Sequence, residues 1–266
     1  MPEYQGPFVS SEVERPAQSA GLGAVSLTVF NRLGGISATL RPGEVTAICG
    51  PNGAGKSTLL ACMAGLLAPD SGSITLDGAP LSSLPPRERA RVIGFLPQTP
   101  EVAWDLTVET LVGLGRLPWR ASPEEDTAAV NAAIETMDLA ALRRRVVTTL
   151  SGGERARALV ARVLAGSPRW LLADEPLANL DLGHQLALLG TLRKLAREQG
   201  LGVVLVLHDL AQAMNFADRV LVLAEGRVLA DGAPEEALAE QIIAAGWGVK
   251  ARWLGEPGAR ALATAG

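Results

Sequence analysis

The sequence predicts an α/β fold that combines a mostly parallel sheet, an antiparallel β edge and an inserted α-helical subdomain. Two observations predict the sheet. Short apolar runs alternate with helical segments along the chain, and one of these runs, Val203–Leu207, is apolar at every position, as in parallel strands buried on both faces. A third observation, the helical character of much of residues 92–150, predicts the insertion.

Composition and charge limit the classes of protein to which the chain can belong. Its 266 residues are 48% hydrophobic and 20% charged, which is typical of a globular protein with a sizeable core. The net charge of −4 argues against a protein that coats nucleic acid, so no nucleic-acid partner is expected. Cys49 and Cys62 lack the spacing of metal ligands, and we expect packed thiols in a reducing compartment.

Neither a membrane span nor a secretory signal is predicted. The longest apolar stretches, such as Leu201–Leu207 and Val220–Ala224, are shorter than the roughly 18 residues that cross a bilayer. The N-terminal residues have neither a positive start nor an apolar run. We therefore expect the chain on the cytoplasmic side of any membrane that it contacts.

The elements follow from turn residues and periodicity. Residues 1–21 are rich in Pro, Glu, Ser and Gln and are expected to form a disordered tail, and 246–266 to form a C-terminal tail after a domain at 22–245. Between the tails, strands are predicted at 25–30, 44–49, 73–76, 170–173, 203–207, 220–224 and 227–230. Helices are predicted at 57–67, 108–114, 124–142 and 183–199.

A glycine-rich segment between a predicted strand and a predicted helix has the pattern G-x-x-x-x-G-K-S. Glycines allow backbone N–H groups to converge on a phosphate, and the following helix N-terminus adds favourable partial charge. Lys56 supplies a positive charge to the β- and γ-phosphates, and the Ser57 hydroxyl can bind Mg²⁺. The candidate phosphate-binding residues are Gly50, Pro51, Asn52, Gly53, Ala54, Gly55, Lys56, Ser57 and Thr58.

Two acidic residues follow the apolar strand 170–173. A carboxylate at the end of this strand, Asp174, would lie beside the Mg²⁺ that bridges the phosphates. Glu175 is the next residue, and we expect it to act as the general base toward the attacking water. The alternative, a pair of acids that caps a helix, becomes less favoured behind a phosphate-binding loop.

A second candidate anion site opens the helix that precedes this strand. Ser151, Gly152, Gly153 and Glu154 combine a hydroxyl, two glycine N–H groups and a helix N-terminus. Together with the two preceding motifs, this segment resembles the signature of the ABC transporter ATPases, and the resemblance covers about 22–245. It implies a P-loop NTPase (RecA-like) core, bound ATP and Mg²⁺, and a head-to-tail dimer in which a second copy of the chain completes each ATP site.

Other positions match the same family. Gln98 is similar to the glutamine that the family places at Mg²⁺ and water, Asp181 lies in a segment that resembles the D-loop, and His208 resembles the switch histidine at the γ-phosphate. Phe30 is the candidate for stacking on adenine, although a buried core phenylalanine explains it nearly as well. The chain departs from the family pattern at three positions near these motifs, Ala156, Ala173 and Ala178.

Three further segments narrow the resemblance. Arg32–Ser37, Arg91–Gln98 with Trp104–Val108, and Gly113–Trp119 look like the ATPases of importers for iron–siderophores, haem or cobalamin. This implies integral-membrane permease subunits and, indirectly, a periplasmic or lipid-anchored substrate-binding protein as partners. Trp104 and Trp119 are expected either to pack within the insertion or to dock the permease. The alternatives are a non-transport ABC ATPase, such as an iron–sulfur cluster assembly factor, and a P-loop kinase or GTPase.

Overall fold

A six-stranded sheet lies at the centre of the computed structural model, which describes residues 21–98, 105–178 and 180–264. The first strand pair of this sheet is antiparallel and the other four pairs are parallel. The strands are, in spatial order, β10 (Arg227–Gly232), β9 (Arg219–Ala224), β3 (Val45–Cys49), β8 (Gly202–Val206), β7 (Trp170–Asp174) and β6 (Ile93–Leu96).

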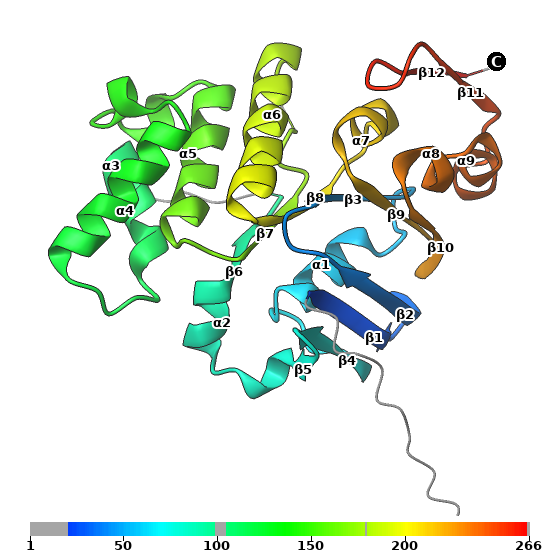
Figure 1. Ribbon diagram of the computed structural model, residues 1–266, viewed down its shortest axis with the longest axis horizontal. Coiled ribbons are helices and arrows are strands. Elements are labelled where there is room, and N and C mark those ends of the chain that lie inside the picture. The colour runs from blue at the N-terminus through cyan, green and yellow to red at the C-terminus, as the bar shows by residue number, and fades with distance from the viewer. Residues whose placement is uncertain (1–20, 99–104, 179, 265–266) are drawn as a thin grey trace, which may run out of the picture.

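The central sheet is buried on both faces because its middle strands carry apolar side chains at consecutive positions. Along β8, Val203 and Leu205 join the hydrophobic cluster on one face, and Val204 and Val206 join the cluster on the other face. The first cluster contains α5 (Gly152–Ala165), α6 (Leu182–Gln199) and α7 (Leu210–Phe216). The second contains α1 (Lys56–Met63), which lies below the sheet in Figure 1.

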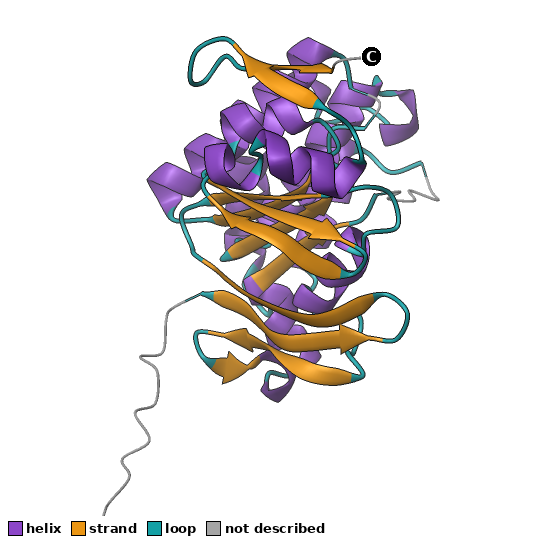
Figure 2. Cartoon of the chain, turned by 90° about the vertical axis from the view of Figure 1, so that its right-hand side faces the viewer, coloured by secondary structure: helices purple, strands orange, loops and turns teal. Residues whose placement is uncertain are grey.

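An antiparallel sheet lies below α1 in Figure 1 and forms the lowest group of strands in Figure 2. Its strands share the second hydrophobic cluster with the central sheet. They are, in spatial order, β2 (Leu33–Leu40), β1 (Leu22–Val29), β4 (Ser71–Leu76) and β5 (Ala79–Pro80). The predicted fold, a mostly parallel sheet with an antiparallel β edge and a helical insertion, is confirmed.

The helical insertion lies to one side of the central sheet in Figure 1. It contains α3 (Val108–Gly113) and α4 (Pro123–Thr136), which pack on each other and on α5. The insertion begins later in the sequence than the predicted boundary at about residue 92. The reason is that Ile93–Leu96 forms β6 of the central sheet, after α2 (Pro86–Val92). Short 3-10 turns occur at Leu81–Ser83, Leu114–Arg116, Ala140–Leu142 and Val147–Thr149.

Two predicted helices end earlier than expected, each two residues before a residue with a positive φ. The helix predicted to reach residue 142 ends at Thr136, and Asp138 follows with φ 50° while the Leu139 N–H donates to the Ile134 carbonyl. The helix predicted to reach residue 67 ends at Met63, and Gly65 has φ 68°. Left-handed residues commonly terminate helices in this way, so the apolar pattern alone overestimated both lengths.

The C-terminal segment folds back on the core instead of forming a plain tail. After α8 (Pro234–Ala237) and α9 (Glu240–Trp247), β11 (Ala251–Leu254) and β12 (Ala261–Thr264) pair as a hairpin. The Trp253 indole donates to the Leu238 carbonyl at 2.8 Å. The Asn215 amide on α7 pairs with both backbone groups of Arg260, at 2.8 and 2.9 Å. These contacts hold the hairpin near α7 and α9 (Figure 1).

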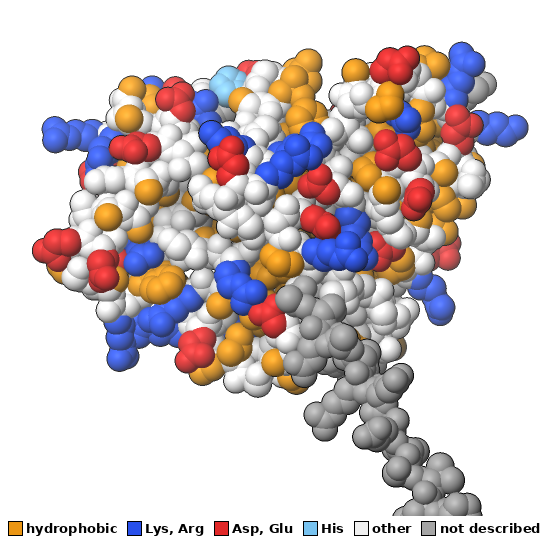
Figure 3. Space-filling model, in the orientation of Figure 1, with side chains coloured by type: hydrophobic (Ala, Val, Ile, Leu, Met, Phe, Trp, Pro, Cys, Tyr) orange, Lys and Arg blue, Asp and Glu red, His pale blue; other side chains and the backbone are white. Residues whose placement is uncertain are grey.

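Some sequence predictions lie outside the described residues: the N-terminal tail up to residue 20, Trp104, and Asn179, the first residue of the segment that resembles the D-loop. Within the part of the chain that the structure describes, no helix is long and apolar enough to cross a membrane. On the face in Figure 3, acidic and basic side chains are interspersed.

Candidate active site

Four parallel strands end at one edge of the central sheet and bring the predicted motifs together. β3 leads into Gly50, β6 into Gln98, β7 ends at Asp174, and β8 is followed by His208 within two residues. The carboxyl ends of parallel strands share one edge, which is the usual ligand site of open α/β sheets. Segments far apart in the sequence thus meet where phosphate-binding residues were predicted.

The loop between β3 and α1 forms a backbone cradle. Gly55 has φ 96°, and a Cβ atom there would lie 2.9 Å from the Arg32 carbonyl oxygen, so a side chain does not fit. α1 begins at Lys56 without a side-chain cap. The first N–H groups of a helix have no partner within the helix, so the N-terminus of α1 can bind an anion.

The Lys56 side chain folds back over this loop. Its Nζ donates to the carbonyls of Gly50 at 2.9 Å and Pro51 at 3.0 Å, and only 6% of the residue is exposed. Burial lowers the pKa of Lys56, and the nearby acidic groups Glu175 and Asp174 oppose that shift. The two carbonyls therefore hold a desolvated ammonium group at the phosphate-binding loop.

Asp174 and Ser57 fit a divalent cation that bridges phosphates. Asp174 is 6% exposed and accepts a hydrogen bond from Ser57, while its Oδ1 has no hydrogen-bond partner among the described residues. Burial raises the pKa of Asp174, because nothing compensates fully for the desolvation of its carboxylate. A buried carboxylate oxygen without a partner, next to a hydroxyl, is a suitable pair of ligands for Mg²⁺.

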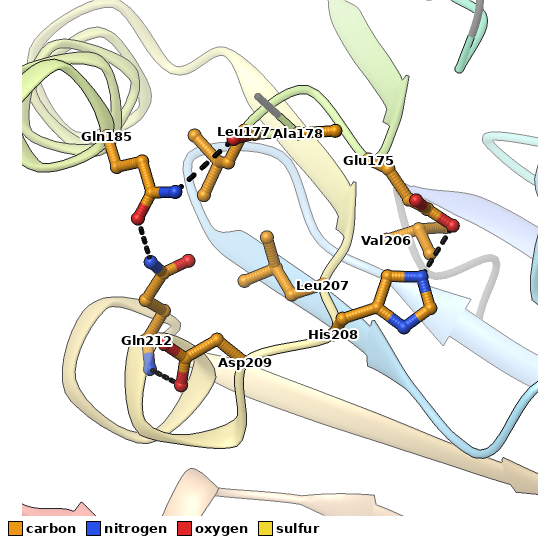
Figure 4. Close-up of a pocket in the computed structure, with 9 residues that line it drawn as sticks. All are labelled: Glu175, Leu177, Ala178, Gln185, Val206, Leu207, His208, Asp209 and Gln212. Atoms are coloured by element: carbon orange, nitrogen blue, oxygen red, sulfur yellow. Dashed lines mark hydrogen bonds and ion pairs between the residues drawn. The ribbon is translucent and has the colours of Figure 1, made fainter. Parts of the chain in front are cut away.

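Glu175 is held between the two other predicted catalytic residues. Gln98 Nε2 donates to one carboxylate oxygen at 2.8 Å, and His208 Nε2 lies 2.5 Å from the other. Figure 4 shows the His208 ring directed at Glu175 from the end of β8. The Glu175 carboxylate is thus oriented by residues from two other strand ends, as a general base requires.

The signature segment forms the N-terminus of α5. Ser151 caps the helix by accepting from the Glu154 N–H at 3.3 Å, and the Glu154 side chain accepts from the Ser151 N–H at 2.9 Å. A cavity of about 240 Å³ lies between Gly152 and the Gln98 and Glu175 side chains. Among the described residues, no hydrogen bond or ion pair joins 151–154 to the phosphate-binding loop at 50–58.

His184 connects the signature segment to Asp181, a contact that sequence analysis missed. Asp181 caps α6 by accepting from the His184 N–H at 2.9 Å, and its second oxygen lies 2.7 Å from His184 Nδ1. The ring lies over Gly153, where a Cβ atom would come within 2.5 Å of it. The Asp-x-x-His spacing at a helix start could have indicated the cap, but the contact with Gly153 depends on the packing of two helices.

Phe30 is exposed. It lies on the turn after β1, and 76% of its surface is accessible, so it is not a core residue. The same turn continues to Arg32 and Leu33, which contact Gly55 of the phosphate-binding loop. The structure therefore places an unpacked aromatic side chain on a segment next to the loop.

The two cysteines are free and buried, as predicted. Cys49 ends β3, directly before the phosphate-binding loop, and burial raises its pKa to about 12. A thiol with this pKa stays protonated at neutral pH and is a weak nucleophile. We therefore assign Cys49 a packing role.

A second hollow separates the helical insertion from β6 and α2. Its volume is about 520 Å³, and Leu66 and Leu117 on its border are 64% and 74% exposed. Trp119 packs beside it: the indole donates to the Gly166 carbonyl at 2.9 Å, and the Cζ atoms of Arg91 and Arg116 lie 4.9 and 4.8 Å from the centre of its ring. These contacts favour packing for Trp119.

The fold and this site define a P-loop ATPase: a glycine-rich loop at a helix N-terminus, a buried carboxylate and an oriented glutamate meet at the ends of parallel strands. The sequence profile of the ABC transporter family matches residues 33–178. The chain belongs to this family, and it is an ATP-binding and ATP-hydrolysing subunit.

Curated relatives support the same assignment. The hemin import ATP-binding protein HmuV of Bordetella avium is 43% identical over 84% of this chain and 88% of its own length. HmuV of Myxococcus xanthus is 44% identical over 85% of this chain and 89% of its own length.

Solved structures agree with this result. A transporter described as metal-chelate type, in an inward-facing conformation, has a TM-score of 0.79 at 26% identity and covers 93% of this chain and 97% of its own. The cbiO1 subunit of Clostridium perfringens has a TM-score of 0.76 at 30% identity and covers 84% of this chain and 92% of its own.

Proposed function

We propose that this ATPase powers the import of hemin, with iron–siderophores and cobalamin as related alternatives. The observation that carries the proposal is the identity of 43% and 44% to two hemin import ATP-binding proteins over most of the chain. The similarity to a metal-chelate type transporter supports it. None of these comparisons favours an iron–sulfur assembly factor, and that alternative is not proposed.

Glu175 is the general base of hydrolysis in this proposal. Its carboxylate accepts a proton from the water that attacks the γ-phosphorus of ATP, and ADP is the leaving group. Gln98 and His208 orient the carboxylate through the contacts at 2.8 and 2.5 Å. His208 is half exposed, so its ring can also meet the γ-phosphate.

The phosphate groups bind to the 50–58 loop and to Lys56. Ser57, Asp174 and Gln98 would hold Mg²⁺, which would supply positive charge against the charge that develops on the phosphates. The unpartnered oxygen of Asp174 supports this assignment. Phe30, exposed beside the loop, stacks on the adenine ring.

A second copy of the chain completes each ATP site. Within one chain, the phosphate-binding loop and Ser151, Gly152, Gly153 and Glu154 make no mutual hydrogen bond among the described residues, although both are anion-binding helix N-termini. A bacterial ABC transporter cassette that is 28% identical, with a TM-score of 0.72 over 80% of this chain and 98% of its own, was solved as a dimer. Asp181 then lies in the dimer interface, close to both sites.

Permease subunits dock in the hollow between the insertion and β6. Its exposed Leu66 and Leu117 offer apolar surface for a helix from a membrane protein, and the hollow adjoins the segment that leads to Gln98. The chain is then held at the cytoplasmic face of the inner membrane, and a periplasmic or lipid-anchored substrate-binding protein delivers the cargo.

Uptake measurements test the transported substrate. In source cells that lack this chain, we expect uptake of iron-labelled hemin to be lost, and to be restored by the wild-type chain but not by Glu175→Gln. The surface variant Gln199→Met serves as the control and restores uptake. Normal hemin uptake in the deletion strain, with uptake of ferric siderophore or cobalamin lost, would replace hemin by that other cargo.

A further inference from the structure

Two glutamine side chains form a bridge between α6 and α7 behind the candidate active site. Gln212 Nε2 on α7 donates to Gln185 Oε1 on α6 at 2.6 Å. Gln185 Nε2 in turn donates to the backbone carbonyls of Leu180 at 3.0 Å and Leu177 at 3.3 Å. Figure 4 shows this bridge, including the bond to Leu177, on the side of the pocket opposite the His208–Glu175 pair.

The chemistry of the groups fixes the direction of the bridge. Backbone carbonyls only accept hydrogen bonds, so the Gln185 amide nitrogen must face Leu177 and Leu180. The Gln185 oxygen is then the atom that faces α7, and only a donor at position 212 can complete the bridge. The bridge therefore has one orientation. Among neutral side chains of this length, only glutamine offers both a hydrogen-bond donor and an acceptor.

The bridge is part of a closed circuit of contacts that returns to the active site. The backbone N–H of Gln212 donates to the Asp209 carboxylate at 3.2 Å, as part of the N-terminal cap of α7. Asp209 directly follows His208, which contacts Glu175 at 2.5 Å. Glu175 in turn lies two residues before Leu177, where the circuit began.

This circuit borders an open cavity of about 210 Å³, which Leu207 also lines (Figure 4). Because His208 lines this cavity, its ring has free space on that side, and packing alone does not fix its position. The hydrogen-bonded rim is then the connection between His208 and the backbone at Leu177 and Leu180.

We propose that Gln185 and Gln212 are positioning residues for ATP hydrolysis, which transmit the positions of the Leu177 and Leu180 carbonyls to His208. The inference rests on the proposed roles of His208 and Glu175. It adds that a movement of the Leu180 carbonyl, next to Asp181 at the proposed dimer interface, displaces His208 through α7. Neither glutamine contacts the phosphate-binding loop, so both act on hydrolysis rather than on ATP affinity.

The test compares Gln185→Met and Gln212→Met with the wild-type chain. Methionine keeps the length and removes the hydrogen bonds. We expect each variant to lower kcat by about three- to tenfold, the range for loss of the one bridging hydrogen bond that both variants share, with the Kd for ATP unchanged within about twofold. The chain has only two histidines, so the NMR signals of the His208 ring can be assigned and should shift in both variants.

Three controls separate this mechanism from a general loss of structure. Gln199→Met, at the exposed end of α6, should change neither kcat nor the His208 signal. In a His208→Ala background, Gln212→Met should cause no further loss of kcat, because its effect passes through His208. The double variant of both glutamines should be no slower than either single variant.

Unchanged His208 signals in both methionine variants would overturn the proposal, and so would an equal further loss of kcat in the His208→Ala background. If His208→Ala itself kept wild-type turnover, the proposed role of His208 would be wrong and the bridge would have nothing to transmit. If His208→Ala lost turnover while Gln185→Met and Gln212→Met kept it, only the role of the bridge would be wrong.

Discussion

Glu175 has φ 52°, a left-handed conformation that costs a non-glycine residue of order 1–3 kcal/mol. The conformation turns the chain sharply after β7, so that Asp174 and Glu175 present their carboxylates to different partners, Ser57 and the Gln98–His208 pair. Backbone strain at such a position is consistent with a functional requirement, because the surrounding structure must maintain it. The left-handed backbone at Glu175 thus supports the proposal that Asp174 and Glu175 have separate roles.

Replacement of the single residue Gly153 tests its contact with the His184 ring. A Cβ atom at position 153 would lie 2.5 Å from the ring, which Asp181 holds in place, so we expect Gly153→Ala to lower the free energy of unfolding by roughly 1–3 kcal/mol. In a His184→Ala background, the same replacement should be neutral or stabilising, as is usual for Gly to Ala in a helix. Urea unfolding of the four chains measures both effects.

Gly190 provides the matched control, because a Cβ atom there meets nothing within 4 Å. Gly190→Ala in α6 should raise the stability by about 0.5–1 kcal/mol. An equal loss of stability for Gly153→Ala with and without the His184 ring would show that the ring is not what excludes a side chain.

Single residues were predictable where a local pattern carried them. Gly55, Lys56, Asp174 and Glu175 stand next to recognisable strands and turns, so that motif and context predicted their place at the ends of β3 and β7. Gln185 and Gln212 have no local signal, because their partner lies 27 residues away on another helix. The exposure of Phe30 also depended on how the turn after β1 meets the rest of the fold.

At the scale of elements, the two larger sheets are tied together by an ion pair between distant segments. Arg169, next to the start of β7, lies 2.8 Å from Asp77, on the turn after β4. This hydrogen bond and the charge of Arg169 hold the pKa of Asp77 below its usual range. Asp77 also accepts from the Gly21 N–H at 3.0 Å.

Asp77→Asn isolates the charge, because asparagine can still accept from Gly21 and tolerates the φ of 50°. We expect a loss of up to about 1 kcal/mol at pH 7, since both partners are more than a third exposed. A depressed pKa adds stability above the usual aspartate pKa of about 4 and loses it as pH falls through the folded-state value. The difference between the two chains should therefore vanish at acidic pH, in denaturant titrations at each pH.

Asp138→Asn is the matched control for this measurement. Asp138 has the same φ of 50°, is exposed, and has no ion pair among the described residues. It should show no comparable loss at pH 7. A difference for Asp77→Asn that persisted unchanged below pH 3 would argue against the ion pair as its cause.

Element types were easier to predict than their limits and pairings. Apolar runs correctly indicated β7, β8 and the β9–β10 hairpin, because buried strands need apolar residues at consecutive positions. The C-terminal hairpin was missed since its strands are short and half buried, and its docking depends on Asn215 and Trp253, which contact distant backbone. Contacts of this kind leave no periodic pattern in either segment.

At the scale of the whole molecule, the ATP-binding edge and the hollow beside the insertion are connected through β6. The strand borders the hollow at Phe95 and leads to Gln98, which contacts Glu175 at 2.8 Å. A partner that fills the hollow can thus affect Glu175, the proposed base of hydrolysis, through a few residues of backbone. The sequence predicted the segments at both ends of this connection as parts of motifs. How these two segments lie relative to each other depends on the tertiary fold, which the motifs alone did not predict.

The proposed hydrolysis of ATP depends on Glu175 as its general base. The most direct measurement compares ATP binding and ATP turnover of Glu175→Gln with those of Lys56→Ala and the wild-type chain. We expect Glu175→Gln to bind ATP normally and to lose on the order of 10²-fold or more in kcat, because glutamine cannot accept the proton. Lys56→Ala should instead weaken ATP binding, since it removes the buried ammonium group at the loop. Turnover by Glu175→Gln comparable to that of the wild-type chain would contradict the account.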